Sequence, residues 1–340
     1  MITVIPSKVT VKSTARLHMG FFDLHGGLGR KFGGIGLSLT APAIELTAIA
    51  NQHPSESEKA LVTGISTVPA TAIMRASAIA EQLIKKLQLT GGVSLNFHQY
   101  IPEHAGLGSG TQLALVIGSA INKLYNLNLN TAQIAELSGR GVRSGIGIAA
   151  FDYGGLLIDG GRASNTVSGK ILSKVPPLLA RYDFPEHWRI LLILDTSQPG
   201  IHGEHELEAF NQLPVFSENL AAHLCRHVLM QAMPALVEQD LTAFGNSIQE
   251  LQAHVGDYFA PAQGGRYASR QVGRVLEHLE HIGVACFGQS SWGPTGFAMF
   301  ENEPDAMGAL NTLQQQFGAF NNISYQIVRG KNSGATIQMS

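Results

Sequence analysis

A glycine-rich turn followed directly by an apolar helical pattern is the clearest candidate for a binding site. Residues 102–115 read PEHAGLGSGTQLAL. Glycines let a backbone approach a ligand closely, and the start of a helix presents N–H groups and the positive end of its dipole. A glycine turn that only packs against a sheet is the alternative. The flanking proline and the small-residue helix favour a phosphate loop instead, formed by Gly106, Leu107, Gly108, Ser109, Gly110 and Thr111.

Two common nucleotide-binding motifs do not match this loop. A dinucleotide-binding motif has the pattern G-x-G-x-x-G next to the first strand, with an acidic residue about 20 residues later. The loop found here begins only at residue 106 and continues GLGSGT. A Walker A loop requires G-K-S or G-K-T, which neither SGKI at residues 168–171 nor RGKN at residues 329–332 supplies. The loop therefore belongs to another type.

A second stretch with possible chemistry is PGIHGEHELEAF, residues 199–210, which contains H-x-x-H. Zinc enzymes typically use H-E-x-x-H on one helix together with further ligands. The proline and the glycines indicate a loop here, and we favour a loop that closes over a substrate. The two cysteines, Cys225 and Cys286, form neither a disulfide framework nor a C-x-x-C zinc pair.

Composition limits the kinds of partner. The chain has 340 residues and a formal net charge of −2 at pH 7, so no global field would attract nucleic acid or an anionic membrane. Anionic substrates must therefore be bound by a local site. The N-terminal residues lack the apolar core of a signal peptide, and no apolar run is long enough to span a membrane. We expect a cytoplasmic protein that acts on small molecules.

The elements that position these residues follow from hydrophobic periodicity. In the first half, strands are predicted at residues 9–17, 41–50, 93–102 and 154–161, and helices at 70–89, 112–127 and 131–141, the last of them capped by Thr131. The glycine-rich residues 20–39 indicate a loop or a tightly turned strand.

A proline-rich, less periodic stretch at residues 174–187 marks the expected domain boundary. After it, strands are predicted at residues 189–195 and 323–328, two more joined by a turn within 283–300, and helices near 217–233, 235–254, 268–282 and 304–317. Strands followed by helices without regular alternation indicate an α+β fold in both halves. The predicted domains are residues 1–185, which carry the phosphate loop, and residues 186–340.

Three motifs together resemble those of the GHMP kinase superfamily. P-x-x-x-G-L-G-S at the loop resembles its second signature, ARLHMGFFDLHG at residues 15–26 its substrate-binding segment, and GQSSWGPTGFAMF at residues 288–300 its third signature. The resemblance implies an N-terminal domain of the ribosomal-S5 type, a ferredoxin-like C-terminal domain and an active site between them.

Two departures from the kinase pattern bear on the reaction. Many of these kinases have a stretch SGID, whose aspartate handles the substrate hydroxyl, and this sequence has Gly147 in its place. Gly110 stands where the kinases more often have a serine near magnesium. Some members lack the aspartate, so an ATP-dependent small-molecule kinase stays an alternative, as does a catalytically inactive sugar-phosphate- or nucleotide-binding relative.

One branch of the superfamily shares these departures, the β-ribofuranosylaminobenzene 5'-phosphate (β-RFAP) synthases of tetrahydromethanopterin biosynthesis and one-carbon metabolism. The matching stretches are RLHMGFFDLHGGLGRKFGGIGLSL, GLGSGTQLAL and RSGIGIAAFDYGGLLIDGG. The resemblance implies condensation of phosphoribosyl pyrophosphate with 4-aminobenzoate or 4-hydroxybenzoate, with loss of CO₂ and pyrophosphate. It also implies a phosphate loop that holds the leaving group, Mg²⁺ or another divalent cation, and a possible homodimer.

This reaction needs cations for phosphate and carboxylate groups, and arginine binds both bidentately. The expected catalytic residues are Arg16, His18, Asp23, Arg143 and Asp152. Arg30, the loop, and Ser290, Ser291, Gly293, Thr295 and Gly296 are expected to bind substrate.

Each of these expectations has a structural alternative. Arg30 and Lys31 could be a solvated pair, Arg143 a helix cap, and His18 a structural histidine. Asp23, Asp152 and Asp159 are the candidate carboxylates for a metal or a cationic intermediate, and the sequence does not choose among them.

Overall fold

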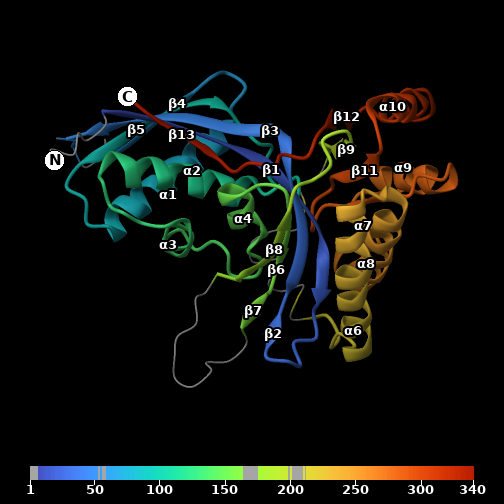
Figure 1. Ribbon diagram of the computed structural model, residues 1–340. Coiled ribbons are helices and arrows are strands. Elements are labelled where there is room, and N and C mark those ends of the chain that lie inside the picture. The colour runs from blue at the N-terminus through green and yellow to red at the C-terminus, as the bar shows by residue number, and fades with distance from the viewer. Residues whose placement is uncertain are drawn as a thin grey trace.

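The computed structural model describes residues 7–52, 54–55, 59–163, 175–197, 200, 210 and 212–340. Two antiparallel-rich sheets, each with helices packed on it, make up this part of the chain (Figure 1). The mixture of strands and helices agrees with the α+β prediction. None of the helices in the described part of the chain combines the length and apolar composition needed to cross a bilayer.

The first sheet has seven strands built around two long ones. Five neighbouring strands have the order β13 (Thr336–Met339), β1 (Lys8–Asp23), β3 (Gly33–Asn51), β5 (Gly92–Gln99) and β4 (Ala60–Gly64). The other two strands extend the sheet from β3: β6 (Leu156–Asp159) pairs with β3, and β8 (Leu178–Tyr182) pairs with β6. The start of β1 alternates between buried and partly exposed residues, but from Ser13 onward almost every side chain is buried. Helices therefore cover both faces of this part of β1.

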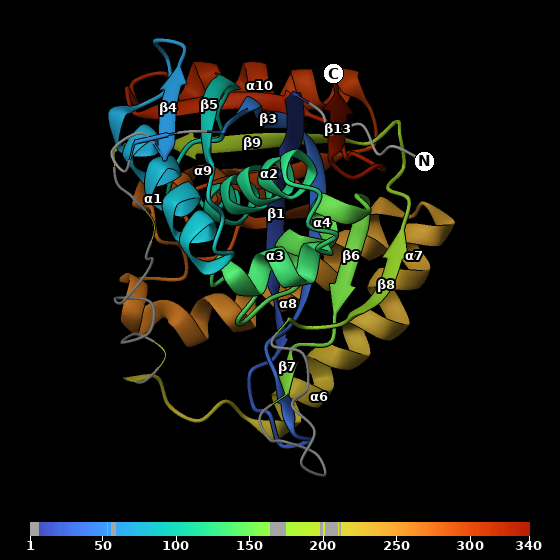
Figure 2. The same cartoon turned by 90° about the vertical axis from the view of Figure 1, so that its left-hand side faces the viewer.

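Four helices lie on one side of β1 (Figure 2): α1 (Ala70–Lys86), α2 (Ser109–Leu124), α3 (Thr131–Leu137) and α4 (Ile146–Asp152). Nearly all of α2 is buried, which its small and apolar sequence allows. The predicted cap of α3 was wrong by one residue. Asn130, not Thr131, precedes the helix, and its side chain accepts a hydrogen bond from the backbone of Gln133.

The second sheet has the order β10 (Cys286–Gln289), β11 (Gly296–Phe300), β9 (Arg189–Asp195) and β12 (Ile323–Val328). Helices α9 (Arg270–His281) and α10 (Glu303–Phe317) bury the apolar cluster of one face. A run of α6 (Glu218–His227), a π-helical turn (Val228–Ala232) and α7 (Met233–Glu238) leads to α8 (Leu241–Gln263). Helices α6 and α8 pack against β1 on the side away from α2 (Figure 1).

Three strands of the first sheet, β4, β8 and β13, lie where periodicity predicted none. β8 lies within the stretch that we expected to be irregular, and the polar strand β13 pairs with β1. The last strand of the chain thus belongs to the first sheet. Of the other strands in the two sheets, those before residue 183 lie in the first sheet and those after residue 188 in the second. The glycine-rich residues 20–39 are mainly strand, because β1 reaches Asp23 and β3 begins at Gly33. A short pair, β2 (Arg30–Lys31) and β7 (Arg162–Ala163), lies beside them.

Candidate functional site

The phosphate loop enters α2 through two glycines in the left-handed region. Gly106 has φ of +79° and Gly108, the residue before the helix, has φ of +81°. No described side chain caps α2, so the N–H groups of Ser109 and Gly110 are left for a ligand. This is the geometry in which a helix N-terminus binds an anion.

Two arginines that the sequence reading missed lie directly over this helix start. A Cβ placed on Gly110 would be 2.7 Å from Nη2 of Arg75 and 3.4 Å from Nη1 of Arg140. Arg75 comes from α1 and donates to Oε1 of Glu103 at 2.8 Å, while Arg140 follows α3. Burial and the neighbouring Arg75 lower the pKa of Arg140. Two adjacent guanidiniums repel each other, so an anion between them relieves that repulsion.

The backbone of the third signature packs directly against the backbone of the phosphate loop. A Cβ on Gly106 would lie 2.9 Å from Cα of Gly293 and would overlap the carbonyl oxygen of Ser290. Ser290 Oγ donates to the Gly106 carbonyl at 2.8 Å and accepts from the backbone N–H of His18 at 3.1 Å. The same carbonyl accepts from Nη1 of Arg16 at 2.6 Å. The structure thereby joins the three sequence motifs in one place.

These groups surround a cleft with about 400 Å³ of room. Its described lining is cationic or polar: Arg16, Arg75, His104, Gly106, Gly108, Ser109, Gly110, Thr111, Arg140, Gly200, Ser291, Trp292 and Gly293. We call it the cationic cleft. Eight of these residues belong to the predicted loop and third signature, and Arg16 to the predicted catalytic set.

Beside the cleft runs a series of aromatic rings. Phe21 lies 5.6 Å from Phe32, Phe32 lies 5.3 Å from Phe210, and Phe210 lies 5.4 Å from Trp292, measured between ring centroids. Phe259 of α8 stacks on Trp292 at 4.1 Å. A narrow cavity of about 30 Å³ lies between Phe259, Trp292, Phe21 and His18, and we call it the aromatic pocket. Trp292 and Ser291 line both the pocket and the cleft.

His18 lies in the wall of the aromatic pocket and is buried. Burial, followed by the charge of Arg16, lowers the pKa of its ring to about 3. Its two ring nitrogens have no hydrogen-bond partner among the described residues. The ring is therefore neutral near pH 7 and keeps one donor and one acceptor for a ligand or a water.

Asp159 is a buried carboxylate at the end of β6. It accepts hydrogen bonds from the Gly161 and Gly145 backbones and from Ser144 Oγ, each at 2.8 Å. Burial nevertheless raises its pKa to about 6. A Cβ on Gly34 would lie 3.6 Å from Oδ2 of Asp159 and 3.0 Å from Nε2 of His18, so both side chains point at this glycine.

Some predicted site residues have structural partners away from the cleft. Asp23 accepts from the backbones of His25 and Gly26 at 2.9 Å and so orders a turn. Exposed Asp152 accepts from Thr131 Oγ1 at 2.5 Å. Arg30 donates to the carbonyls of Gly160 and Gly161 at 2.7 Å each, which holds β2 to the turn before β7.

Of the remaining predicted residues, one lies beside the aromatic series and the others are buried in the protein. Arg143 lies over the Phe210 ring of the aromatic series, with Cζ 5.2 Å from its centroid, and does not line the cationic cleft. Leu107, Ser290 and Thr295 are buried. Gly296 lies within β11, where a Cβ would press on Val272. These positions shape the walls of the site from behind.

The donor set of the cationic cleft does not fit a protein-held magnesium ion. Mg²⁺ prefers oxygen ligands and is usually bound through one or two carboxylates. The cleft lining contains no carboxylate among the described residues, and Glu103 behind it is paired with Arg75. The H-x-x-H stretch within residues 199–210 falls mostly outside the described residues, as does the closing loop expected there.

The position where the kinases have an aspartate is closely packed. A Cβ on Gly147 would lie 3.0 Å from Cγ2 of Thr111, and its carbonyl accepts from Nε2 of Gln112 at 2.7 Å. A longer side chain at this position would therefore push against the phosphate loop.

Comparisons with known proteins agree with this geometry. Residues 73–155 match the family model of the GHMP kinases N terminal domain, and residues 232–319 match that of the GHMP kinases C terminal domain. A β-ribofuranosylphenol 5'-phosphate synthase from Archaeoglobus fulgidus is 34% identical over 97% of this chain and 99% of its own. The protein of that name from Methanocaldococcus jannaschii is 33% identical over 96% of this chain and 99% of its own. The crystal structure of a homoserine kinase from Cytophaga hutchinsonii has a TM-score of 0.68 at 15% identity and covers 99% of both chains, so the predicted GHMP kinase fold is confirmed.

Proposed function

The chain belongs to the family of the β-ribofuranosylphenol 5'-phosphate synthases within the GHMP kinase superfamily, and on this premise we propose its reaction. The protein condenses phosphoribosyl pyrophosphate with a 4-substituted benzoate and releases CO₂ and pyrophosphate. The observation that carries the proposal is that the cationic cleft and the aromatic pocket meet at Ser291 and Trp292. A polyanion and an aromatic ring can thus bind side by side.

The reaction balances without a proton donor or an external oxidant. The bond between ribosyl C1 and the diphosphate oxygen breaks, and the diphosphate leaves with that electron pair. The benzoate carbon that bears the carboxylate forms the new bond to C1. The bond from this carbon to the carboxylate then breaks, its electrons restore the aromatic ring, and CO₂ leaves. No general base for a hydroxyl is required, which agrees with a glycine at position 147.

We assign the diphosphate to the start of α2. Negative charge develops on the leaving oxygen, and prearranged N–H donors and guanidiniums stabilise such charge most in a water-poor site. Arg75 and Arg140 flank Gly110, and the free N–H groups of the loop face the same cleft. Because the cleft offers cations and no carboxylate among its described lining, any divalent cation would be carried by the diphosphate.

We assign the benzoate to the mouth of the aromatic pocket. The pocket itself has about 30 Å³ of room, which is too little for a benzoate ring. At the mouth the ring would contact Trp292 and Phe210, and the guanidinium of Arg143 over Phe210 could pair with the carboxylate. Neutral His18 in the pocket wall is placed to contact the 4-substituent or a water, because its ring nitrogens are not used by the described residues.

The ATP-dependent kinase alternative has weaker support. Its serine and aspartate positions are Gly110 and Gly147 here, and the space beside each is filled by Arg75 and Thr111 respectively. An inactive binding protein would not need two partly buried cations beside an aromatic pocket.

The experiment is an incubation of the purified protein with phosphoribosyl pyrophosphate and Mg²⁺, with either 4-hydroxybenzoate or 4-aminobenzoate labelled in the carboxyl group. Labelled CO₂ is expected with at least one acid, and the names of the relatives favour 4-hydroxybenzoate as the better substrate. Formation of ADP from ATP with an alcohol, and no CO₂ from either acid, would favour the kinase. Binding without turnover would favour the inactive relative. A cytoplasmic location, a homodimer and a role in tetrahydromethanopterin biosynthesis stay predictions.

A further inference from the structure

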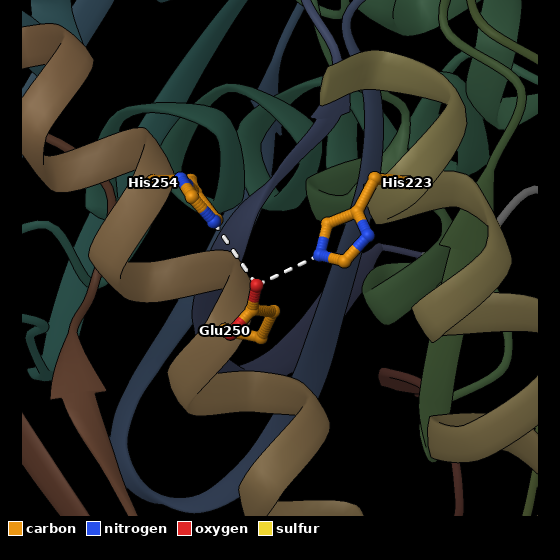
Figure 3. Close-up of side chains that lie close together, drawn as sticks. All are labelled: His223, Glu250 and His254. Atoms are coloured by element: carbon orange, nitrogen blue, oxygen red, sulfur yellow. Dashed lines mark hydrogen bonds and ion pairs between the residues drawn. The ribbon is translucent and has the colours of Figure 1, made fainter. Parts of the chain in front are cut away.

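Helices α6 and α8 bring two histidines and a glutamate together at a surface that the proposed reaction does not use. Figure 3 shows His223 of α6 facing Glu250 and His254 of α8. Oε1 of Glu250 lies 2.7 Å from Nε2 of His223 and 3.0 Å from Nε2 of His254. The ligand atoms of all three residues lie within 4.8 Å of one another.

We propose that these three side chains bind a divalent transition-metal ion, with Zn²⁺ as the best match. Two imidazoles and one carboxylate form a ligand set that suits zinc, whereas Mg²⁺ and Ca²⁺ prefer oxygen alone. In a tetrahedral zinc site with bonds of about 2.0–2.2 Å, neighbouring ligand atoms are about 3.4 Å apart. The two separations of 2.7 and 3.0 Å are close to this value, so small side-chain rotations would admit the ion.

The surroundings allow both entry of the ion and a stable site. The three side chains are 44%, 36% and 40% exposed, which leaves a path from solvent and a fourth position for water. Oε1 of Glu250 already faces both imidazoles, so one carboxylate oxygen is available as a ligand between them. His227, one turn along α6 from His223, has its Nδ1 paired with Gln231 at 2.9 Å and is not needed as a ligand.

A metal ion here would link two helices that pack on β1. Cys225 of α6 contacts the carbonyl of Phe22 through Sγ at 3.8 Å, and Phe259 lies on α8 beyond His254, in the wall of the aromatic pocket. The ion would hold α6 and α8 at a fixed spacing and so stabilise this wall. The site does not depend on the proposed reaction, because none of its three residues lines the cationic cleft or the aromatic pocket.

The test is calorimetric titration of the metal-free, full-length protein with Zn²⁺, together with Co²⁺ absorption spectra as a report of tetrahedral geometry. We expect one Zn²⁺ per chain at this site and a melting temperature raised by a few degrees at saturating metal. His223→Ala and His254→Ala should each raise the Kd at least tenfold. Glu250→Gln keeps the shape of the side chain and should also weaken binding, which covers the case in which a histidine variant is unstable.

Two controls separate this site from other histidines. His281 is exposed at the end of α9, and His281→Ala should bind Zn²⁺ like the wild type. A His202→Ala/His205→Ala double variant removes the H-x-x-H spacing and should also keep binding at the proposed site. The proposal is overturned if the wild type does not bind Zn²⁺, if the cluster variants bind as tightly as the wild type, or if only the H-x-x-H variant loses the ion.

Discussion

At the scale of single residues, Gly110 marks the point at the start of α2 where the guanidiniums of Arg75 and Arg140 come together. Arg140 is partly buried beside Arg75 over the start of α2, where the proposed diphosphate lies. Arg140→Ala should raise the KM for phosphoribosyl pyrophosphate about tenfold to a hundredfold, because one charge-assisted hydrogen bond contributes about 1.5–3 kcal/mol. The KM for the benzoate should change little. Steady-state kinetics with each substrate varied in turn measures this difference.

Arg226→Ala serves as the matched control, since Arg226 is exposed on α6 and lies outside the cleft lining. Equal effects of Arg140→Ala on both KM values, or none on either, would contradict the assignment of the diphosphate to this position.

Buried Asp159 makes the stability of the protein depend on pH. Burial raises its pKa from 3.8 to about 6, so the folded state binds this proton more tightly than the unfolded state. Its contribution to stability is therefore fully present below pH 3.8, decreases as the pH rises through 6, and levels off above that. The shift corresponds to about 3 kcal/mol at most.

Denaturant unfolding of the wild type and Asp159→Asn between pH 4 and pH 7.5 measures this contribution. Because asparagine does not titrate, the wild type should lose stability relative to the variant as the pH rises. A difference that is independent of pH would show that Asp159 keeps its ordinary pKa in the folded protein.

Some of the residues that line the cationic cleft were indicated by the sequence, and others were not. The loop glycines, Ser291 and Gly293 were recognisable because close backbone approach requires particular residue types. Arg75 and Arg140 were not recognisable, since an arginine on a helix or at its end has the same local pattern whether it is solvated or aimed at a ligand. Only the packing of α1 and of α3 against α2 places them together.

At the scale of elements, the contact between α2 and α3 depends on one glycine. A Cβ on Gly118 would overlap Cγ2 of Ile134, and its other near neighbour is Cδ1 of Leu83 at 3.6 Å. Gly118→Ala should therefore destabilise the protein by about 1–3 kcal/mol through overpacking, although alanine favours helices. In an Ile134→Ala background the same change should be neutral, or stabilising by about 1 kcal/mol.

A double-mutant cycle of unfolding free energies measures this coupling. Additive effects of the two substitutions would contradict the close packing of these helices.

Helices and strands with a strong hydrophobic periodicity were predicted. Strands that form only by pairing with a strand far away in the sequence were not. Residues 70–89 and 112–127 carry clear helical patterns and contain α1 and most of α2. β13 has the polar sequence TIQM and forms because β1 offers an unpaired edge to it. β8 likewise depends on pairing with β6. Such pairing joins residues far apart in the sequence, and local periodicity contains no signal for it.

At the scale of the whole molecule, the site depends on contact between the two sheets. Arg75, Arg140 and the phosphate loop come with the first sheet, while Trp292 and Phe259 come with the second sheet and α8. The sites for polyanion and aromatic ring therefore come from different parts of the chain and meet at Ser291 and Trp292. We infer that one catalytic event uses both.

The most direct test is to measure CO₂ and pyrophosphate from the same reaction mixture of protein, phosphoribosyl pyrophosphate and 4-hydroxybenzoate. Equal amounts of the two products at every time point, both dependent on the benzoate and neither on ATP, are the expected result. Pyrophosphate released without CO₂, or no product unless ATP is added, would contradict the proposed reaction.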